Sequence, residues 1–412
     1  MDAHAIGRRI AYWRDRRRLT QQDLGHLMGR SRRGIQDLER GERQADPRIS
    51  VLEDAARALR IPLAWLLADG PERAALDPVE LEEIRATLQC YDVITGSTGD
   101  DSPVPDTPAL SRRVAHGWDS FQGGALVSLG RALPRLITET SRAAARHTGD
   151  DQLAARRALA MTLCLTEAIA IKYGSADLAE IAGHRAVLAA EQTGDIVTMA
   201  TAARHLADAM AYHGRPDAAA AAARAAAARL APGLERAGAA GLSTLGMLHL
   251  KAAYAEAAAA RLDTRTAAAS ARAVPAHLDQ AAEHAARLGG TTNAVWTAFS
   301  TANVQLYRLA AHVQLAEGDD GVRVALEMPK AAVLALPRER RAHRLVDLAH
   351  AHTLAGQRGA AVDALLDAER EAAQEVRCRP RTRQLVQELS LLPTGPAEGR
   401  LRQLAVRCGL PQ

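Results

Sequence analysis

Aromatic residues and cysteines are scarce in this sequence. Aromatics make up 3% of the 412 residues, so a folded core must depend on many Leu, Val and Ala contacts between closely approaching segments. The 4 cysteines, Cys90, Cys164, Cys378 and Cys408, lie far apart, without the short spacing of a metal site. We therefore expect free thiols in a reducing cytosol.

Long apolar runs are missing as well. Arg224 and Arg229 interrupt the alanine-rich tract 218–231, so no stretch of roughly 18 apolar residues exists. The N-terminus carries charges but no apolar segment of the kind that forms a signal peptide. We expect a cytoplasmic protein with no membrane segment.

Sequence motifs of catalysis are also lacking. There is no His-Glu-x-x-His, phosphate loop, paired-glycine nucleotide fingerprint or nucleophile elbow. His343, Asp347 and His350 would share one helix face and place ligands near one metal ion. Neighbouring arginines would repel such a cation. They are Arg338, Arg340, Arg341 and Arg344. We expect no metal, no cofactor and no enzymatic activity.

Positive charge, in contrast, is concentrated at one end of the chain. Residues 1–70 contain 14 arginines and 10 acidic residues, whereas the remaining 342 residues contain 38 basic and 38 acidic ones. The net charge of +4 therefore lies entirely in the first sixth of the sequence. A basic N-terminal segment in an otherwise neutral chain favours contact between that segment and a polyanion.

Residues 19–43 are typical of two short helices joined by a tight turn. Thr20 is a good N-cap with Asp23 three residues later, which predicts a helix from about Gln21. The apolar stripe expected on this helix consists of Leu24, Leu27 and Met28. Gly29 supplies the left-handed residue that ends it, and small Gly25 predicts a close approach of the next helix.

The second of these helices carries an outward polar face. Ser31 is its N-cap, and Ile35 and Leu38 point into the shared core. The opposite face consists of Arg32, Arg33, Gln36, Asp37 and Arg40. Two arginines in a first turn oppose the helix dipole, so the pattern favours an external anion such as a phosphate. The alternative is an ordinary solvated face.

These residues resemble a known family. Residues 6–67 are similar to the Cro/repressor-type (XRE-type) helix-turn-helix domain, through Thr20-Gln21, Gly25, Gly29, the exit 38–41 and the closing segment 61–67. The resemblance implies a five-helix module that binds double-stranded DNA, with Arg14 paired to Glu39 and Gln21 beside a phosphate. The DNA-contacting residues that we predict are Gln21, Arg32, Arg33, Gln36, Asp37, Arg40 and Arg43.

Two residues depart from the family pattern. Arg30 stands where an apolar residue usually follows the turn glycine, and its stem can lie over the core with the charge in solvent. Gly34 stands where a larger residue is usual, so base readout at that point would be absent. In such helices arginine recognises guanine, Gln36 would recognise adenine, and Asp37 would accept from cytosine.

The remaining chain divides into a linker region and a long helical domain. We predict a DNA-binding domain over 1–70, a helix and flexible linker over 71–108, and a helical domain over 109–412. Asp77 before Pro78 indicates a helix to about Tyr91, and residues 95–108 are rich in Gly, Ser, Thr, Asp and Pro. No strand pattern is seen after this linker, so the whole protein is expected to be all-α.

Helical stretches in residues 109–412 alternate with brief glycine breaks. The breaks are at Gly149, Gly194, Gly214, Gly289, Gly318 and Gly356. Around Gly214 and Gly356 the sequence shares one frame, with Leu eight residues before the glycine and two alanines four and five residues after it. This recurrence resembles a degenerate tetratricopeptide-type α-solenoid built from stacked helical hairpins.

The concave face of such a solenoid is the expected ligand site. Candidate lining residues are Tyr212, Trp296, Asn303 and Tyr307. With Phe299, the last three would share one helical face, and an apolar core stripe is the alternative explanation of that pattern.

Two functions fit these features. The first is a homodimeric transcription regulator that binds an operator and responds to a small molecule, peptide or protein effector. The alternative is a protein-interaction adaptor with weak or vestigial DNA binding. The preference for arginine over lysine, 49 to 3, is typical of a high-GC genome such as that of an actinobacterium.

Overall fold

The structure is a computed structural model that describes most of the chain. The described residues are 3–17, 19–41, 48–59, 61, 63, 66, 78–90, 104–263, 265, 267–290, 292–391 and 395–410. Among them every regular element is a helix, which confirms the all-α prediction. They form two compact units, one built from α1 to α4 and the other from α8 to α23.

The first unit contains four described helices around one apolar core. They are α1 (Ala3–Arg16), α2 (Gln21–Leu27), α3 (Arg32–Arg40) and α4 (Ile49–Ala58). Leu24 and Ile35 are fully buried, and Met28 and Leu38 pack against the same core, as predicted. Leu27 was expected in this stripe but is 59% exposed, because only Leu24 and Met28, four residues apart, share the buried face. The predicted closing helix at 61–67 lies largely outside the described residues.

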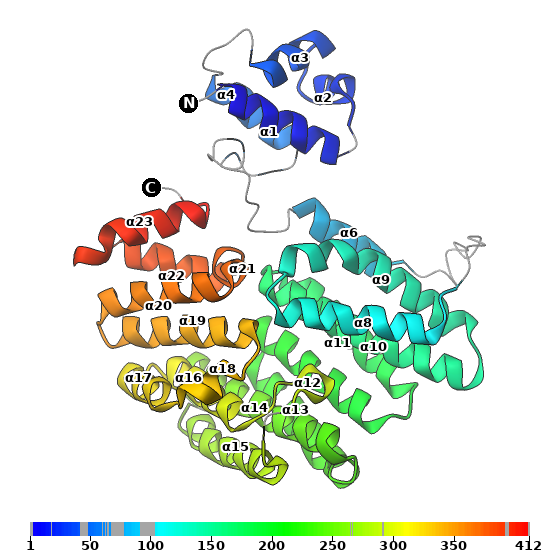
Figure 1. The fold of residues 1–412 in the computed structure, drawn as a ribbon, viewed down its shortest axis with the longest axis vertical. Helices are drawn as coiled ribbons and strands as arrows, with labels where there is room; N and C mark the ends of the chain where they lie inside the picture. The colour runs from blue at the N-terminus through cyan, green and yellow to red at the C-terminus, as the bar shows by residue number, and fades with distance from the viewer. Residues whose placement is uncertain are drawn as a thin grey trace. The chain divides into compact units, whose positions relative to one another are not determined.

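The second unit is a stack of helical hairpins (Figure 1). Each hairpin contributes one inner and one outer helix. The inner helices are α8 (Thr107–Gln122), α10 (Gly149–Lys172), α12 (Ile196–Tyr212), α14 (Gly238–Leu262), α16 (Thr301–Gln314), α19 (Arg338–Leu354) and α22 (Pro380–Ser390). The outer helices are α9 (Leu126–Arg146), α11 (Ala176–Glu191), α13 (Pro216–Leu234), α15 (Ala267–Leu288), α17 (Gly318–Glu327), α20 (Arg358–Glu371) and α23 (Glu398–Arg407). Each inner helix also contacts the next inner helix along the chain.

Short elements complete the described structure. They are α6 (Pro78–Leu88), η2 (Ala294–Trp296), α18 (Lys330–Leu334), α21 (Ala373–Arg377) and η3 (Gly395–Ala397). Arg85 of α6 forms an ion pair of 2.6 Å with Asp177 at the start of α11. Within the described part of the chain, no helix combines the length and apolar character that crossing a bilayer requires.

The stack of hairpins closes on itself. Helix α19 lies against α8, although more than 200 residues separate them in sequence. The Lys172 ammonium of α10 lies 2.5 Å from Glu339 of α19 and 2.8 Å from Glu375 of α21, and all three side chains are buried. Burial opposes ionisation of Glu339, but Lys172 and Arg340 outweigh it and lower its pKa to about 2.

The repeat frame that the sequence indicates is present in the structure. Gly214 and Gly356 are left-handed, with φ of +79° and +74°, and each ends an inner helix. Ala207 and Ala219, and likewise Ala349 and Ala361, are buried between the two helices of their hairpins. Small residues at these offsets let the antiparallel helices approach closely, which confirms the helical-repeat prediction.

Two details of the repeat differ from the simplest form of the sequence pattern. The break expected at Gly318 lies just before it: Gly318 begins α17, and Ala316, with φ of +62°, is the left-handed residue of the turn. A Cβ on Gly318 would lie 2.7 Å from the backbone nitrogen of Ala355, so this glycine is needed for close packing rather than for the turn. Contrary to the prediction, Trp296 and Phe299 do not share a helix with Asn303 and Tyr307, because α16 begins only at Thr301.

Candidate functional sites

The helix-turn-helix segment of the first unit is fixed by local hydrogen bonds. The Thr20 hydroxyl accepts from the Asp23 backbone N–H at 3.1 Å, and the Asp23 carboxylate accepts from the Thr20 N–H at 2.8 Å. Gly29 is left-handed with φ of +63°. A Cβ on Gly25 would lie 2.6 Å from the Arg30 carbonyl oxygen, so the absent side chain admits the turn that leads into α3. These features confirm the predicted caps and turn.

Glu39 ties the first three helices together. Its carboxylate accepts from Arg14 Nε at 2.6 Å and from Gln21 Nε2 at 2.8 Å. The side chains of Arg14 and Glu39 are only 12% and 7% exposed. The hydrogen bond to Glu39 raises the pKa of Arg14, so its guanidinium remains charged over the physiological range. The Arg14–Glu39 pairing implied by the resemblance is present, and it holds α3 at a set angle.

The outward face of α3 is where the sequence predicts it. Ser31 caps the helix by accepting from the Gly34 N–H at 3.2 Å, and no acidic residue lies in the first turn. Arg32 and Arg33 are exposed, and neither has a hydrogen bond or ion pair with any described residue. Two unpaired guanidinium groups thus stand at a helix N-terminus, where a phosphate would neutralise them.

The other predicted DNA-contacting residues differ from Arg32 and Arg33 in their exposure or in their contacts within the protein. Gln36 and Asp37 are half-buried on α3, Arg40 is exposed at its end, and Gln21 is engaged by Glu39. Arg43 lies outside the described residues. Arg30 is exposed after the turn, and a Cβ on Gly34 would meet the Ser31 hydroxyl at 3.5 Å and the Arg30 Cβ at 4.0 Å, so it would fit without a clash.

A cavity of about 450 Å³ lies on the concave side of the helical repeat. Its walls come from all the inner helices, α8 to α22, with Trp296 of η2 and Pro216 at the start of α13. Tyr212, Trp296 and Tyr307, which were predicted as ligand contacts, are among the lining residues. Asn303 is not, because its side chain is fully buried and donates to the Thr297 carbonyl at 3.4 Å.

The cavity is lined by more cations than acids. Seven lysine or arginine side chains and four acidic ones contribute to its walls. The cationic residues are Lys172, Arg204, Lys251, Arg261, Arg340, Arg379 and Arg381. The acidic residues are Glu167, Asp208, Glu339 and Asp347. Burial raises the pKa values of Glu167 and Asp347, which further reduces the negative charge of the cavity.

Acidic and histidine ligands for a metal come together at one wall of this cavity. Donor atoms of Glu167, His205 and Asp208 lie within 4.8 Å of one another. However, the Lys251 ammonium lies 2.6 Å from Asp208 Oδ2 and already occupies the position of a counter-ion. Arg204 also lies on α12, four residues before Asp208, so the local charge disfavours a divalent cation.

The histidines first considered as metal ligands, His343 and His350, lie in a similar environment. His343 Nε2 lies 3.7 Å from Asp347 Oδ2, and burial lowers the pKa of His343 well below its usual value. Burial also lowers the pKa of His350 to about 3. Both imidazoles are therefore neutral near pH 7, beside several arginines.

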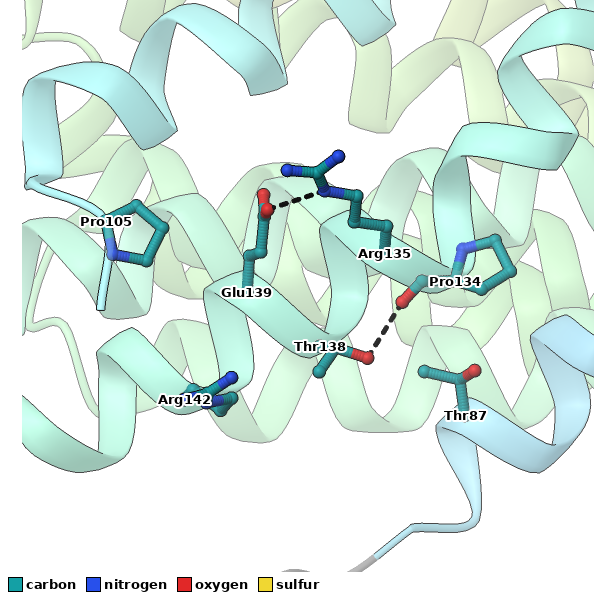
Figure 2. A pocket seen from close by; sticks show the side chains of 7 residues that line it. All are labelled: Thr87, Pro105, Pro134, Arg135, Thr138, Glu139 and Arg142. Atoms are coloured by element: carbon teal, nitrogen blue, oxygen red, sulfur yellow. Dashed lines mark hydrogen bonds and ion pairs between the residues drawn. The ribbon is translucent and has the colours of Figure 1, made fainter. Parts of the chain in front are cut away.

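A shallower groove of about 540 Å³ lies along the outer helix α9 (Figure 2). Figure 2 shows Arg135 and Glu139 paired across one helical turn, at 2.8 Å, with Pro105 on one side and Thr87 on the other. Arg113 also bonds to Glu139, so the carboxylate has both its partners within the chain and the groove offers no unpaired charge there.

Sequence reasoning missed most of the cavity. Arg204, Lys251 and Arg340 lie on three different helices, and no motif joins them in sequence. The available signal was weak: Lys172 and Lys251 are two of only 3 lysines in a chain of 49 arginines, and both are buried in ion pairs at this cavity.

Comparisons with known proteins identify a family model for part of the first unit and solved structures similar to most of the chain. Residues 10–66 match the family model described as Helix-turn-helix. No curated protein matches the chain. Among solved structures, the chain is similar to BtubC (BKLC) from P. vanneervenii, with a TM-score of 0.35, 16% identity, and 64% of this chain and 91% of that chain covered.

A second solved structure is Bacillus thuringiensis PlcR in complex with the peptide PapR7 and DNA. It matches with a TM-score of 0.25 and 14% identity, covering 70% of this chain and 99% of that chain. The caps, the turn and the Glu39 contacts described above agree with the family match. Residues 10–66 are a helix-turn-helix domain of the Cro/repressor type, a domain whose presence supports DNA binding.

Proposed function

We propose that this protein is a sequence-specific transcription regulator that binds a two-fold operator as a homodimer. In this proposal its helical-repeat unit binds an effector in the concave cavity and thereby controls operator binding. The observation that carries the proposal is the pair Arg32 and Arg33, exposed and without a partner among described residues on α3.

The chemistry of α3 supports recognition of the major groove. An arginine can donate two hydrogen bonds to guanine O6 and N7, and the amide of Gln36 can donate to and accept from adenine. Arg32 and Arg40 at the two ends of the face suit the flanking phosphates, which fix register but carry no sequence information. Because Glu39 locks α3 against α1 and α2, the face would be presented as a rigid surface.

Dimer formation is proposed from the way that helix-turn-helix proteins generally bind operators. Helix-turn-helix proteins generally read two half-sites about 34 Å apart, one turn of duplex, with two recognition helices. A helical-repeat unit that changes its packing when an effector binds would alter that separation and so the affinity.

The test is recovery of DNA from fragmented genomic DNA by the purified full-length protein, followed by titration of the recovered fragment against salt. We expect a near-palindromic site bound at least about a thousandfold more tightly than bulk DNA. Log affinity should fall steeply with log salt concentration. Weak binding of every fragment alike, together with stoichiometric retention of a protein partner, would contradict the proposal and favour the adaptor function.

A further inference from the structure

One arginine in the concave cavity lacks the partners that buried charges normally have. Arg204 of α12 is 2% exposed and lines the cavity. It forms no hydrogen bond or ion pair with any described residue, and its Nε is buried without an acceptor. A buried, unpaired guanidinium is costly for the fold, so its presence needs a compensating role.

Other donors beside Arg204 are also without acceptors. The Trp118 Nε1–H is buried and unpartnered within the described structure. His205 Nδ1 lies 2.6 Å from Glu167 Oε2, and burial raises the pKa of Glu167 and lowers that of His205. With the proton on the carboxyl group, which then donates to Nδ1, His205 Nε2 carries the N–H of the neutral imidazole. His205 Nε2 also has no described partner.

The positive charge near Arg204 is not cancelled by its neighbours. Arg340 and Lys251 belong to the same lining, and the Lys251 ammonium lies 5.1 Å from the centre of the Tyr307 ring. The Lys251 ammonium pairs with Asp208 at 2.6 Å, and Arg340 Nε lies 3.5 Å from Glu339 Oε2. Arg204 is therefore the cation of this wall that has no ion pair with a described residue, and an anionic group could pair with it.

An aromatic surface adjoins this positive wall. The Trp296 ring stacks on Trp118 with centres 6.0 Å apart and planes 18° from parallel, and Trp118 also lies 5.6 Å from the His205 ring. Trp296 Nε1 donates to Asp119 at 2.9 Å, which fixes the ring. The aromatic and cationic parts are therefore contiguous around His205.

The segment that presents Trp296 is strained. Val295, Trp296 and Ala298 have φ of +46°, +52° and +48°, although none is glycine. The left-handed conformation is unfavourable for residues that carry a Cβ, and strain of this kind concentrates at ligand sites. The Gln122 amide holds the segment by donating to Asn293 at 3.0 Å and to the Trp296 carbonyl at 3.1 Å.

We infer that the cavity binds a small organic anion with a planar aromatic part. Its acidic group would pair with Arg204 and the N–H donors of Trp118 and His205, and its ring would pack on Trp296. The volume of about 450 Å³ suits a drug-sized molecule and not an extended peptide. This inference rests on the proposed function only in naming the anion as the effector.

The test measures binding to the full-length protein without DNA, by titration calorimetry. The probe is indole-3-acetate, a planar aromatic carboxylate, and the matched probes are neutral indole-3-acetamide and cationic tryptamine. We expect indole-3-acetate to bind one site with a dissociation constant of about 1 mM or tighter. The amide and the amine should bind at least about tenfold more weakly.

Substitutions of Arg204 distinguish a role in ligand binding from a role in stabilising the fold. Arg204→Met should weaken binding of indole-3-acetate at least about tenfold, and Arg204→Lys, which keeps the charge, should weaken it less. The control Arg229→Gln removes an exposed arginine of the outer helix α13 and should change nothing. The Tm of ligand-free Arg204→Met should equal or exceed that of the wild type, because the change removes an unpaired buried charge.

Three results would overturn the inference: no binding of indole-3-acetate, equal binding of all three probes, or affinity that Arg204→Met and Arg204→Lys leave unchanged. A fall in Tm of more than about 4 °C for ligand-free Arg204→Met would assign a structural role to Arg204 and also overturn it. If a specific operator is recovered but the probe does not bind, the inference fails alone. If the probe binds but no operator is recovered, the anion site stands without the proposed function.

Discussion

At the scale of single residues, the geometry of the DNA-binding face depends on a few buried polar contacts. Glu39 holds Arg14 and Gln21 together, while the exposed Arg32 and Arg33 have no described partner. The buried contacts stabilise the fold, and the exposed residues are left available for a ligand. This division is expected where a rigid scaffold presents a binding surface.

Substitution of Gly34, the unusual glycine of α3, tests whether this position requires a glycine. A Cβ there would lie 3.5 Å from the Ser31 hydroxyl and 4.0 Å from the Arg30 Cβ, both ordinary contacts, and the residue lies in the first turn of a regular helix. Gly34→Ala should therefore raise the free energy of unfolding of the first unit by about 0.5–1 kcal/mol. Denaturant unfolding monitored by circular dichroism would measure it.

The matched control is Gly25→Ala, where the new Cβ would lie 2.6 Å from the Arg30 carbonyl oxygen. This change should destabilise the unit, since backbone must move to admit it. Equal effects at the two positions would show that the close approach at Gly25 does not limit the side chain.

At the scale of helices and turns, one geometry recurs through the helical repeat. Five inner helices end in a left-handed residue, followed by a backbone N–H that donates to the carbonyl five residues earlier, at 2.8–2.9 Å. The left-handed residues are Gly124, Gly174, Gly214, Ala316 and Gly356. Four are glycine, as this C-terminal motif favours, and Ala316 carries the strain of a Cβ.

Exchanging alanine and glycine in two of these turns gives a reciprocal prediction. Ala316→Gly should stabilise the repeat unit by about 1 kcal/mol, and Gly356→Ala should destabilise it by a similar amount. Around Gly356 a Cβ would meet nothing within 4 Å, so its cost would come from the backbone conformation alone.

Thermal unfolding of both variants and of the double variant would measure these effects. The double variant should return to the wild-type Tm, since the turns are distant and independent. Stabilisation by both changes, or by neither, would contradict the assigned conformation of Ala316.

Elements with local signals were predictable from the sequence, and those formed by distant contacts were not. Thr20, Ser31 and Gly29 act within four residues of their own position, so their caps and turn could be read directly. The strained 295–298 segment was predicted as helix, because its conformation depends on contacts to α8 from Gln122 and Asp119. Arg204 and Arg340 line one cavity because the whole repeat curves, and the sequence of a single repeat does not reveal that curvature.

At the scale of the whole molecule, closure of the repeat depends on Lys172. Its ammonium joins α10 to Glu339 of α19 and Glu375 of α21, and it lies 5.3 Å from the centre of the Phe121 ring. Without the Lys172 ammonium, Glu339 would keep Arg340 at 3.5 Å and Glu375 would keep Arg379 at 3.4 Å, but the buried ion pairs that join α10 to α19 and α21 would be lost.

Acid should destabilise the protein through buried histidines. His249 lies between His277 and His284, with ring centres 5.9 and 5.7 Å away. Burial lowers the pKa of all three, that of His249 to about 4. Charged neighbours are Arg224, Glu235, Glu256, Glu283 and Arg287. These histidines stay neutral when folded but take up protons when unfolded below about pH 6.5, so stability is full above pH 6.5 and falls toward pH 4.

His249→Gln should therefore remove part of the acid sensitivity, about 2 kcal/mol of the loss between pH 7 and pH 4.5. The Tm measured at the two pH values would report it, with the exposed His116→Gln as the control. A pH dependence identical in all three proteins would show that the three-histidine cluster does not contribute.

The central claim, that α3 reads a specific DNA site, is tested most directly by operator affinity. The measurement is titration of the recovered operator with wild-type protein, Arg33→Ala, Gln36→Ala and the distant control Arg229→Ala, with folding checked by circular dichroism. We expect Arg33→Ala and Gln36→Ala each to lose about 1–3 kcal/mol of specific binding while the control retains full affinity. Operator affinity unchanged in both α3 variants would contradict the assigned recognition face.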